Sequence, residues 1–281
     1  MMVHGTRKRF WRDFTSAEIA ALDRENTIVV LPLAAIEQHG PHLPLSVDTT
    51  IIEGLIDRVQ QHLAEDAQVV FLPVCQVGKS NEHASFPGTL TLSAETLTRV
   101  WMELGDAVAA CDLRRLVLFN SHGGQTALLD VVARDLRTRH GMFVAKCSWY
   151  QFGLPEGIFD ATETRHGIHG GDVETSMMLA LAPDLVQMDR AANFVALSAE
   201  LEAEFPLLMR DDGGLFGWKI EDLNPQGAAG NAARASAAKG HQVLDFAARR
   251  FAELLMEVGR FPLARLGGAS RTSPPPAHHA A

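Results

Sequence analysis

A dense group of metal-binding residue types lies between residues 37 and 48. Glu37 and His39 are two positions apart, and Asp48 follows nine residues after His39. In an extended segment such a spacing places Glu37 and His39 on one face. The glycine and prolines between them and Asp48 prevent regular structure, so the chain can turn and bring Asp48 back. Carboxylates with imidazoles suit zinc, manganese or iron(II); the alternative is a polar loop with a helix-capping aspartate.

Two further histidines lie beside pairs of glycines. His122 precedes Gly123 and Gly124, where a strand is expected to give way to a helix. The glycines let the backbone approach a ligand, and N–H groups at a helix start favour an anion or a developing oxyanion. His169 precedes a second Gly-Gly pair and is a candidate general acid or base.

Two other segments contain polar residues with more than one interpretation. Asp172 and Glu174 fall in the expected first turn of a helix, where the helix dipole stabilises carboxylates. They are therefore either structural or part of the site. The loop 78–89 contains His83 and a Phe-Pro-Gly turn, and we expect it to contact a metal, a substrate or another subunit, or to be structural.

Short apolar runs are predicted to be the strands that position these residues, and they span 27–33, 68–74, 115–120 and 142–148. Helical periodicity separates them at 49–64, 93–111 and 125–139. This alternation predicts an α/β fold, a three-layer α/β/α sandwich with a mostly parallel sheet. Later helices are expected at 172–181 and 232–258, with a break near Gly240, around an irregular segment at 191–229. Ligands bind beyond the carboxyl ends of such strands, where the polar groups fall.

Length and composition predict one enzyme-sized domain. The chain has 281 residues, of which 47% are hydrophobic and 21% charged, which excludes a disordered or fibrous protein. We expect a single domain over residues 1–262 and a disordered Pro/Ala/Gly-rich tail over 263–281. The net charge of −9 argues against a nucleic-acid partner, and no run approaches the length of a membrane span. Widely spaced cysteines and the lack of a signal peptide favour a cytoplasmic location.

These motifs together resemble the creatininase (creatinine amidohydrolase) family. The matching stretches are 37–44 with Asp48, 82–89, 120–124, 169–176, 223–231 and 239–240. The resemblance extends from about residue 10 to residue 258. It implies a three-layer α/β/α fold and two divalent metal ions per chain, either Zn, Mn or Fe. It also implies hydrolysis of a non-peptide C–N bond, in a cyclic amide or a formamide, by a metal-activated water. A small-molecule amide substrate and a homo-oligomer, commonly a hexamer, are typical of the family.

The resemblance further implies roles for individual residues. Four residues match the family's metal ligands, with Asp48 bridging two ions: Glu37, His39, Asp48 and His122. Glu174 matches a glutamate at the catalytic centre, and His169 matches the histidine that passes a proton to the leaving nitrogen.

Some positions depart from creatininase itself. Gly124 stands where creatininase has a glutamate that binds the second metal. A replacement is expected from Glu174, or less readily from Asp172; otherwise the second ion is weak or absent. Gly123 replaces an aromatic residue and Arg165 replaces a substrate-covering tryptophan.

The expected substrate is therefore not creatinine. Residues predicted to contact the substrate are His83, Gly123, Gly124, Trp149 and Arg165. Other family branches share the His-Gly-Gly pattern, including deformylases of purine-like or flavin-pathway intermediates and the peptide-processing member of the mycofactocin pathway. Two other classes stay open, a single-metal lyase or isomerase and a non-catalytic metal-binding scaffold. The glycine at 124 favours a scaffold, whereas His169 and Glu174 favour an enzyme.

Overall fold

The central sheet of the computed structural model, which describes residues 8–210 and 213–267, is parallel throughout. Within these residues its strand order is β2-β1-β3-β4. The strands are β1 Ile28–Leu33, β2 Val69–Phe71, β3 Arg115–Asn120 and β4 Phe143–Ser148. The predicted parallel sheet is confirmed. β2 is shorter than the predicted run, and the chain meets β1 again at Cys75, whose N–H donates to the Pro32 carbonyl at 2.9 Å.

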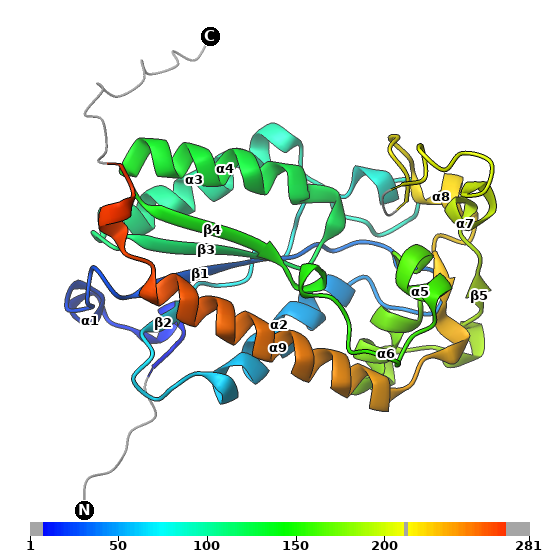
Figure 1. The fold of residues 1–281 in the computed structure, drawn as a ribbon, viewed down its shortest axis with the longest axis horizontal. Coiled ribbons are helices and arrows are strands. Elements are labelled where there is room, and N and C mark those ends of the chain that lie inside the picture. The colour runs from blue at the N-terminus through cyan, green and yellow to red at the C-terminus, as the bar shows by residue number, and fades with distance from the viewer. Residues whose placement is uncertain (1–7, 211–212, 268–281) are drawn as a thin grey trace, which may run out of the picture.

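Helices cover both faces of the sheet and complete the predicted three layers (Figure 1). One face carries α3 Ala94–Ala110 and α4 Thr126–His140. The other carries α2 Val47–His62, α6 Asp172–Leu181 and α9 Ala237–Arg260. Neighbouring residues of β1 pack into opposite layers, Val29 against α3 and α4 and Val30 against α2 and α9. Every residue of β1 is buried, as a strand covered on both faces requires.

The long helix α9 runs through Gly240 without the predicted break. A Cβ at position 240 would lie 1.9 Å from the main-chain oxygen of Ser176 in α6. Gly240 therefore permits close helix packing, and the prediction of a break there was wrong. The helix begins later than predicted because Ser236 caps it, accepting a hydrogen bond from the Lys239 N–H.

The segment between α6 and α9 is largely irregular, as predicted. Its short elements are β5 Asn193–Phe194, α7 Leu197–Leu201, α8 Ile220–Leu223 and β6 Gly230–Asn231. Two short helices, α1 Ser16–Ala20 and α5 Ala161–His166, give too few apolar repeats to be seen in the sequence. Single 3-10 turns are η1 Trp11–Asp13, η2 Asn81–His83, η3 Gly123–Gln125, η4 Trp149–Phe152, η5 Pro183–Leu185, η6 Met188–Arg190, η7 Ala232–Arg234 and η8 Leu263–Arg265.

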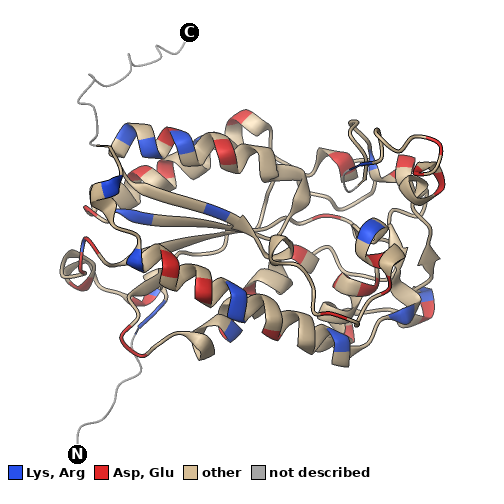
Figure 2. Ribbon diagram, viewed as in Figure 1, with Lys and Arg blue, Asp and Glu red and all other residues tan. Residues whose placement is uncertain are grey.

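The ends of the chain and its charges complete the description. The predicted tail, 263–281, begins with η8, and its residues 268–281 lie outside the described part of the chain. Lys and Arg are interspersed with Asp and Glu along the helices (Figure 2). Among the described helices, none combines the length and the apolar character needed to cross a bilayer.

Candidate metal centre

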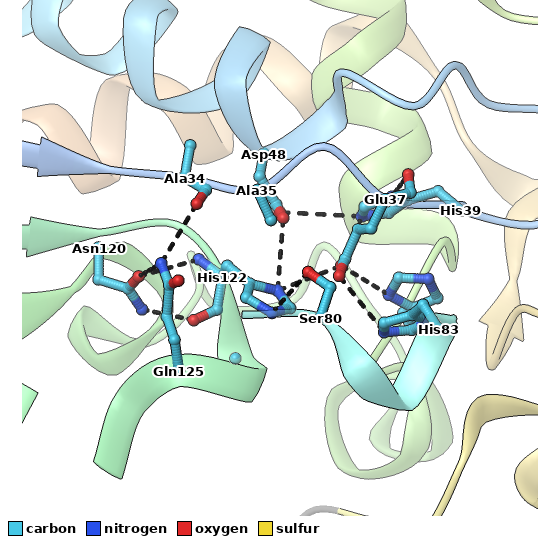
Figure 3. Close-up of polar contacts among 12 residues, drawn as sticks. Ala34, Ala35, Glu37, His39, Asp48, Ser80, His83, Asn120, His122 and Gln125 are labelled. Atoms are coloured by element: carbon cyan, nitrogen blue, oxygen red, sulfur yellow. Dashed lines mark hydrogen bonds and ion pairs between the residues drawn. The ribbon is translucent and has the colours of Figure 1, made fainter. Parts of the chain in front are cut away.

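Polar side chains from several segments converge beyond the carboxyl ends of the strands. Figure 3 shows Glu37 and His39 from the segment after β1, Asp48 from α2, His83 from η2 and His122 from the end of β3. Glu174 joins them from the first turn of α6, and His169 from the segment just before that helix. These side chains are buried except for Glu174, which is 16% exposed. The structure thus brings together the predicted ligands and the predicted proton-transfer residues.

Asp48 faces two histidines with its two carboxylate oxygens. Oδ1 lies 3.8 Å from His39 Nε2, and Oδ2 lies 3.5 Å from His122 Nδ1. On one side Glu37 Oε1 lies 3.2 Å from His122 Nδ1, and on the other Glu174 Oε2 lies 3.8 Å from His39 Nε2. Two adjoining ligand sets result, Glu37–Asp48–His122 and His39–Asp48–Glu174, which share Asp48.

Main-chain carbonyls fix which nitrogen of each histidine faces the carboxylates. His122 Nε2 lies 2.9 Å from the Lys79 carbonyl, and His39 Nδ1 lies 3.2 Å from the Glu37 carbonyl. Because a carbonyl can only accept, these two nitrogens carry the protons. The other nitrogens, His122 Nδ1 and His39 Nε2, therefore point at the carboxylates and are the ones available to a metal ion, as in metal-binding imidazoles.

Three buried atoms of this cluster have no hydrogen-bond partner, namely Glu37 Oε2, His39 Nε2 and Asp48 Oδ2. Leaving a buried carboxylate oxygen or a bare imidazole nitrogen unsatisfied is costly. Divalent cations held by the two ligand sets would satisfy these atoms, and this mixture of oxygen and nitrogen donors suits zinc or manganese. The residues present therefore fit a divalent metal centre.

The pKa shifts within the cluster also favour a bound cation. Burial raises the pKa of Asp48 well above its usual range, and the Glu37 carboxylate adds to the shift. Burial also raises the pKa of Glu174. Burial opposes charging of His122, but the adjacent Glu37 carboxylate outweighs it and holds the pKa of His122 well above its usual value. In the metal-free chain His122 therefore takes a second proton, on Nδ1, and this positive charge stands where a bound cation would replace it.

Three imidazoles form a continuous stack beside these ligands. The ring centroids of His39 and His169 are 4.1 Å apart, and those of His169 and His83 are also 4.1 Å apart. Burial lowers the pKa of His169 to about 4, with His39 adding to the shift, and lowers the pKa of His83 to about 2, with His169 adding. Both rings are therefore neutral near pH 7.

Glu82 is a member of the cluster that the sequence analysis did not assign. Its Oε1 lies 3.3 Å from His122 Nε2, and Glu37, Glu82 and His122 together could hold an ion. A Cβ at Gly124 would lie 1.6 Å from Glu82 Oε1, so this carboxylate fills the space beside Gly124. The signal was present in the sequence as an acid next to His83 together with a glycine at a ligand position.

Asp172, the other predicted replacement ligand, takes part in a different interaction. Its carboxylate pairs with Lys239 and accepts a hydrogen bond from the Ser176 hydroxyl at 3.0 Å. These contacts tie α6 to the start of α9. Of the two predicted replacements, only Glu174 joins the candidate metal ligands.

The predicted substrate-contacting residues fall in two groups. His83 lies 3.7 Å from Glu37 Oε2, and Gly123 and Gly124 directly follow His122. By contrast, Trp149 is 4% exposed and packs in the hydrophobic core. The Arg165 guanidinium contacts Glu202 and the main-chain oxygens of Met209 and Arg210, which anchors the segment after α7.

Tyr150 is an aromatic residue near the centre that the sequence analysis did not single out. Its Oη lies 4.0 Å from where a Gly123 Cβ would stand, and no other atom comes as near to that position. Tyr150 follows Trp149 in η4 and packs edge-on against its ring. The aromatic neighbour of Gly123 is therefore Tyr150.

Comparisons with known proteins agree with this geometry. The sequence matches the family described as creatininase, creatinine amidohydrolase, over residues 12–255. The mycofactocin precursor peptide peptidase of Mycobacterium tuberculosis is 33% identical over 236 residues, covering 81% of this chain and 84% of that protein. The creatinine amidohydrolase of Pseudomonas putida is 31% identical over 199 residues, which cover 65% of this chain and 74% of that protein.

Solved structures show the same fold. A mutant creatininase of the Zn-Zn type matches with a TM-score of 0.72 and 27% identity, over 90% of this chain and 100% of that one. Creatininase with Mn matches with a TM-score of 0.69 and 26% identity, over 90% of this chain and 100% of that one. The family resemblance seen in the motifs is confirmed, and the chain belongs to the creatininase family.

Proposed function

We propose that this chain is a hydrolase that cleaves an amide C–N bond and depends on two divalent ions, Zn, Mn or Fe. The observation that carries the proposal is Asp48, whose two oxygens face two histidine nitrogens available to a metal ion. Glu37, Asp48 and His122 would hold one ion, and His39, Asp48 and Glu174 the other. Glu82 would complete the first set from the side of Gly124. Relatives with zinc and with manganese support the choice of metals.

The chain's own residues supply the proton transfers. Ions at this position add Lewis acidity, which makes water more acidic and an amide carbonyl more electrophilic. His169 directs Nδ1 toward the centre, 3.9 Å from Glu37 Oε1, where it can take a proton from water and return it to the leaving nitrogen. The Gly170 N–H donates to Glu174 Oε2 at 2.6 Å and holds that carboxylate in place.

A peptide amide is the first substrate class to test. The similarity to a precursor peptide peptidase supports it, and so does the open space at Gly123, where a larger substrate can approach. A cyclic amide or a formamide, as the sequence resemblance implies, is the second class, supported by the similarity to creatinine amidohydrolase. Product analysis in oxygen-18 water distinguishes either hydrolysis from a lyase or isomerase, because only hydrolysis must incorporate solvent oxygen.

Metal analysis of Asp48→Ala tests the centre itself. We expect two ions per chain in the wild type purified without chelator, and loss of both ions and of activity in the variant. Asp57→Ala is the matched control, since Asp57 is an exposed carboxylate on the same helix. Full metal occupancy with full activity in Asp48→Ala would overturn the proposal, and a metal-free wild type after reconstitution would favour a scaffold.

The proposal includes a homo-oligomer, the hexamer being the form that the family resemblance implies. Large apolar side chains are exposed after α7, namely Phe205, Leu207, Leu208, Leu215 and Phe216. Exposed apolar residues gathered in one segment are typical of a contact surface. Light scattering coupled to gel filtration measures the assembly, and a monomer at all concentrations would contradict this part.

A further inference from the structure

We infer that Gln38 is a positioning residue that gives His83 and His169 opposite hydrogen-bonding roles toward the centre. Gln38 lies between the proposed ligands Glu37 and His39 in the chain. Its side-chain nitrogen lies 2.9 Å from His83 Nδ1 and 3.4 Å from His169 Nε2, and its main-chain carbonyl lies 2.7 Å from His169 Nε2. The catalytic meaning of these roles rests on the proposed function, whereas the roles themselves follow from hydrogen bonds.

The orientation of the Gln38 amide is fixed by Gly40. The Gly40 N–H donates to Gln38 Oε1 at 2.9 Å, which identifies that atom as the oxygen. Gly40 adopts a φ of 75°, and a Cβ there would lie 2.9 Å from the Ala228 Cβ. Glycine at position 40 therefore places the N–H that holds the amide.

The amide in turn determines where His83 carries its proton. With Oε1 bonded to Gly40, the Gln38 NH2 lies 2.9 Å from His83 Nδ1. An NH2 group can only donate, so Nδ1 is bare and the proton is on Nε2. That N–H faces Glu37 Oε2 at 3.7 Å, an oxygen with no hydrogen-bond partner. His83 thus presents a donor to the centre.

The main chain of Gln38 produces the opposite result for His169. His169 Nε2 lies 2.7 Å from the Gln38 carbonyl and must carry the proton that the carbonyl accepts. Its bare Nδ1 therefore faces the centre, 3.9 Å from Glu37 Oε1. Two stacked neutral rings present an N–H and a bare nitrogen to the two oxygens of one carboxylate. Of these two rings, only His169 can accept a proton from the centre, and only His83 can donate a hydrogen bond toward it.

Nitrogen NMR of histidine-labelled, zinc-loaded full-length protein reads these tautomers directly. We expect a bare Nδ1 and a protonated Nε2 for both His83 and His169 in the wild type. Gln38→Glu keeps the bond to Gly40 but places an acceptor at His83 Nδ1, so Nδ1 of His83 should become protonated. The His169 tautomer should not change, because its Nε2 already carries the proton that the Gln38 main-chain carbonyl accepts, and an added acceptor 3.4 Å away leaves that proton in place. Gln60→Glu, with the same charge change on the partly exposed surface of α2, should alter neither ring.

Three outcomes would overturn the inference. They are a wild-type His83 with its proton on Nδ1, an unchanged His83 in Gln38→Glu, or a change at His169 equal to that at His83. Gln38→Met, which removes the amide at similar length, should lower kcat about 10- to 100-fold while metal content and KM stay near wild type. A purely structural role would instead lower stability without moving the His83 proton. If NMR finds the expected tautomers but the protein hydrolyses no amide, the proposed function fails and the positioning role of Gln38 stands.

Discussion

Asp48 is a carboxylate on which both proposed ion positions depend, whereas Glu174 belongs to one of them; Glu37, closest to His122, also comes within 3.8 Å of His39 Nε2. The two Asp48 oxygens lie against His39 on one side and His122 on the other. Glu174 approaches only His39, and Glu37 approaches His122 most closely. This difference between a shared and an unshared carboxylate has a measurable consequence for metal stoichiometry.

Removing one unshared carboxylate should remove one ion. We predict that Glu174→Gln retains about one ion per chain after dialysis against a weak chelator, because the Glu37–Asp48–His122 set stays intact. Asp48→Asn should retain none, since both sets lose a charged ligand. Elemental analysis of the dialysed proteins measures the ratio. Equal losses in the two variants would show that Glu174 is not confined to one ion.

At the scale of elements, a carboxylate at the same place beside His122 could come from either of two loops. The loop after β2 supplies Glu82, and the loop after β3 leaves room for it with Gly124. The family resemblance implies that in creatininase itself the second loop carries the glutamate. The two arrangements exclude each other sterically, because an added Cβ at 124 would overlap the Glu82 carboxylate.

Moving the carboxylate between the loops tests this exclusion. We predict that Glu82→Ala weakens metal retention about 10- to 100-fold, because the first ligand set loses a carboxylate that also contacts His122. Gly124→Glu alone should also weaken it, through the clash. The double variant Glu82→Ala/Gly124→Glu should recover much of the loss, measured by competition with a fluorescent chelator. A double variant no better than the worse single variant would contradict the idea.

The packing of α6 against α9 gives a second prediction at this scale. Gly240→Ala should destabilise the fold by about 1–3 kcal/mol, since overpacking against the Ser176 main chain exceeds the gain of about 1 kcal/mol in helix propensity. Gly259→Ala in the same helix should be neutral or stabilising, because its Cβ would meet only Ile28 Cδ1 at an ordinary 3.5 Å. Urea unfolding of both variants measures the difference, and equal effects would show that Gly240 is not needed for packing.

For the whole molecule, ion removal should lower thermal stability. An ion that binds only the native state stabilises it by about 2.7 kcal/mol when its free concentration is 100 times Kd. We predict that a strong chelator lowers Tm by several degrees, and that zinc or manganese restores it. Asp48→Ala should show no such shift. Scanning calorimetry measures both, and a chelator-insensitive wild type would count against the centre.

Much of the molecule was predictable from the sequence, for physical reasons. Buried parallel strands have continuous apolar sequences. The sequence therefore predicted β1, β3 and the sheet edge where Glu37 and His122 meet. Gly240 led to the wrong prediction of a break in α9, because in sequence a glycine that permits close helix packing cannot be told from one that ends a helix. Glu82 was missed because its place depends on a contact with Gly124, far away in the sequence. Which neighbours a side chain meets is a property of packing and not of local pattern.

The scattering of the ligands along the chain has a consequence for biosynthesis. Gln38 and His169 touch although 131 positions separate them, and Glu174 lies further on still. A loop of this length must be closed before the cluster exists. On the ribosome, the growing chain therefore has no complete centre until α6 has emerged and packed against α2. The proposed ions would therefore meet ligands that folding has already brought together, and the choice between zinc, manganese and iron would be made by the folded protein and the ions around it.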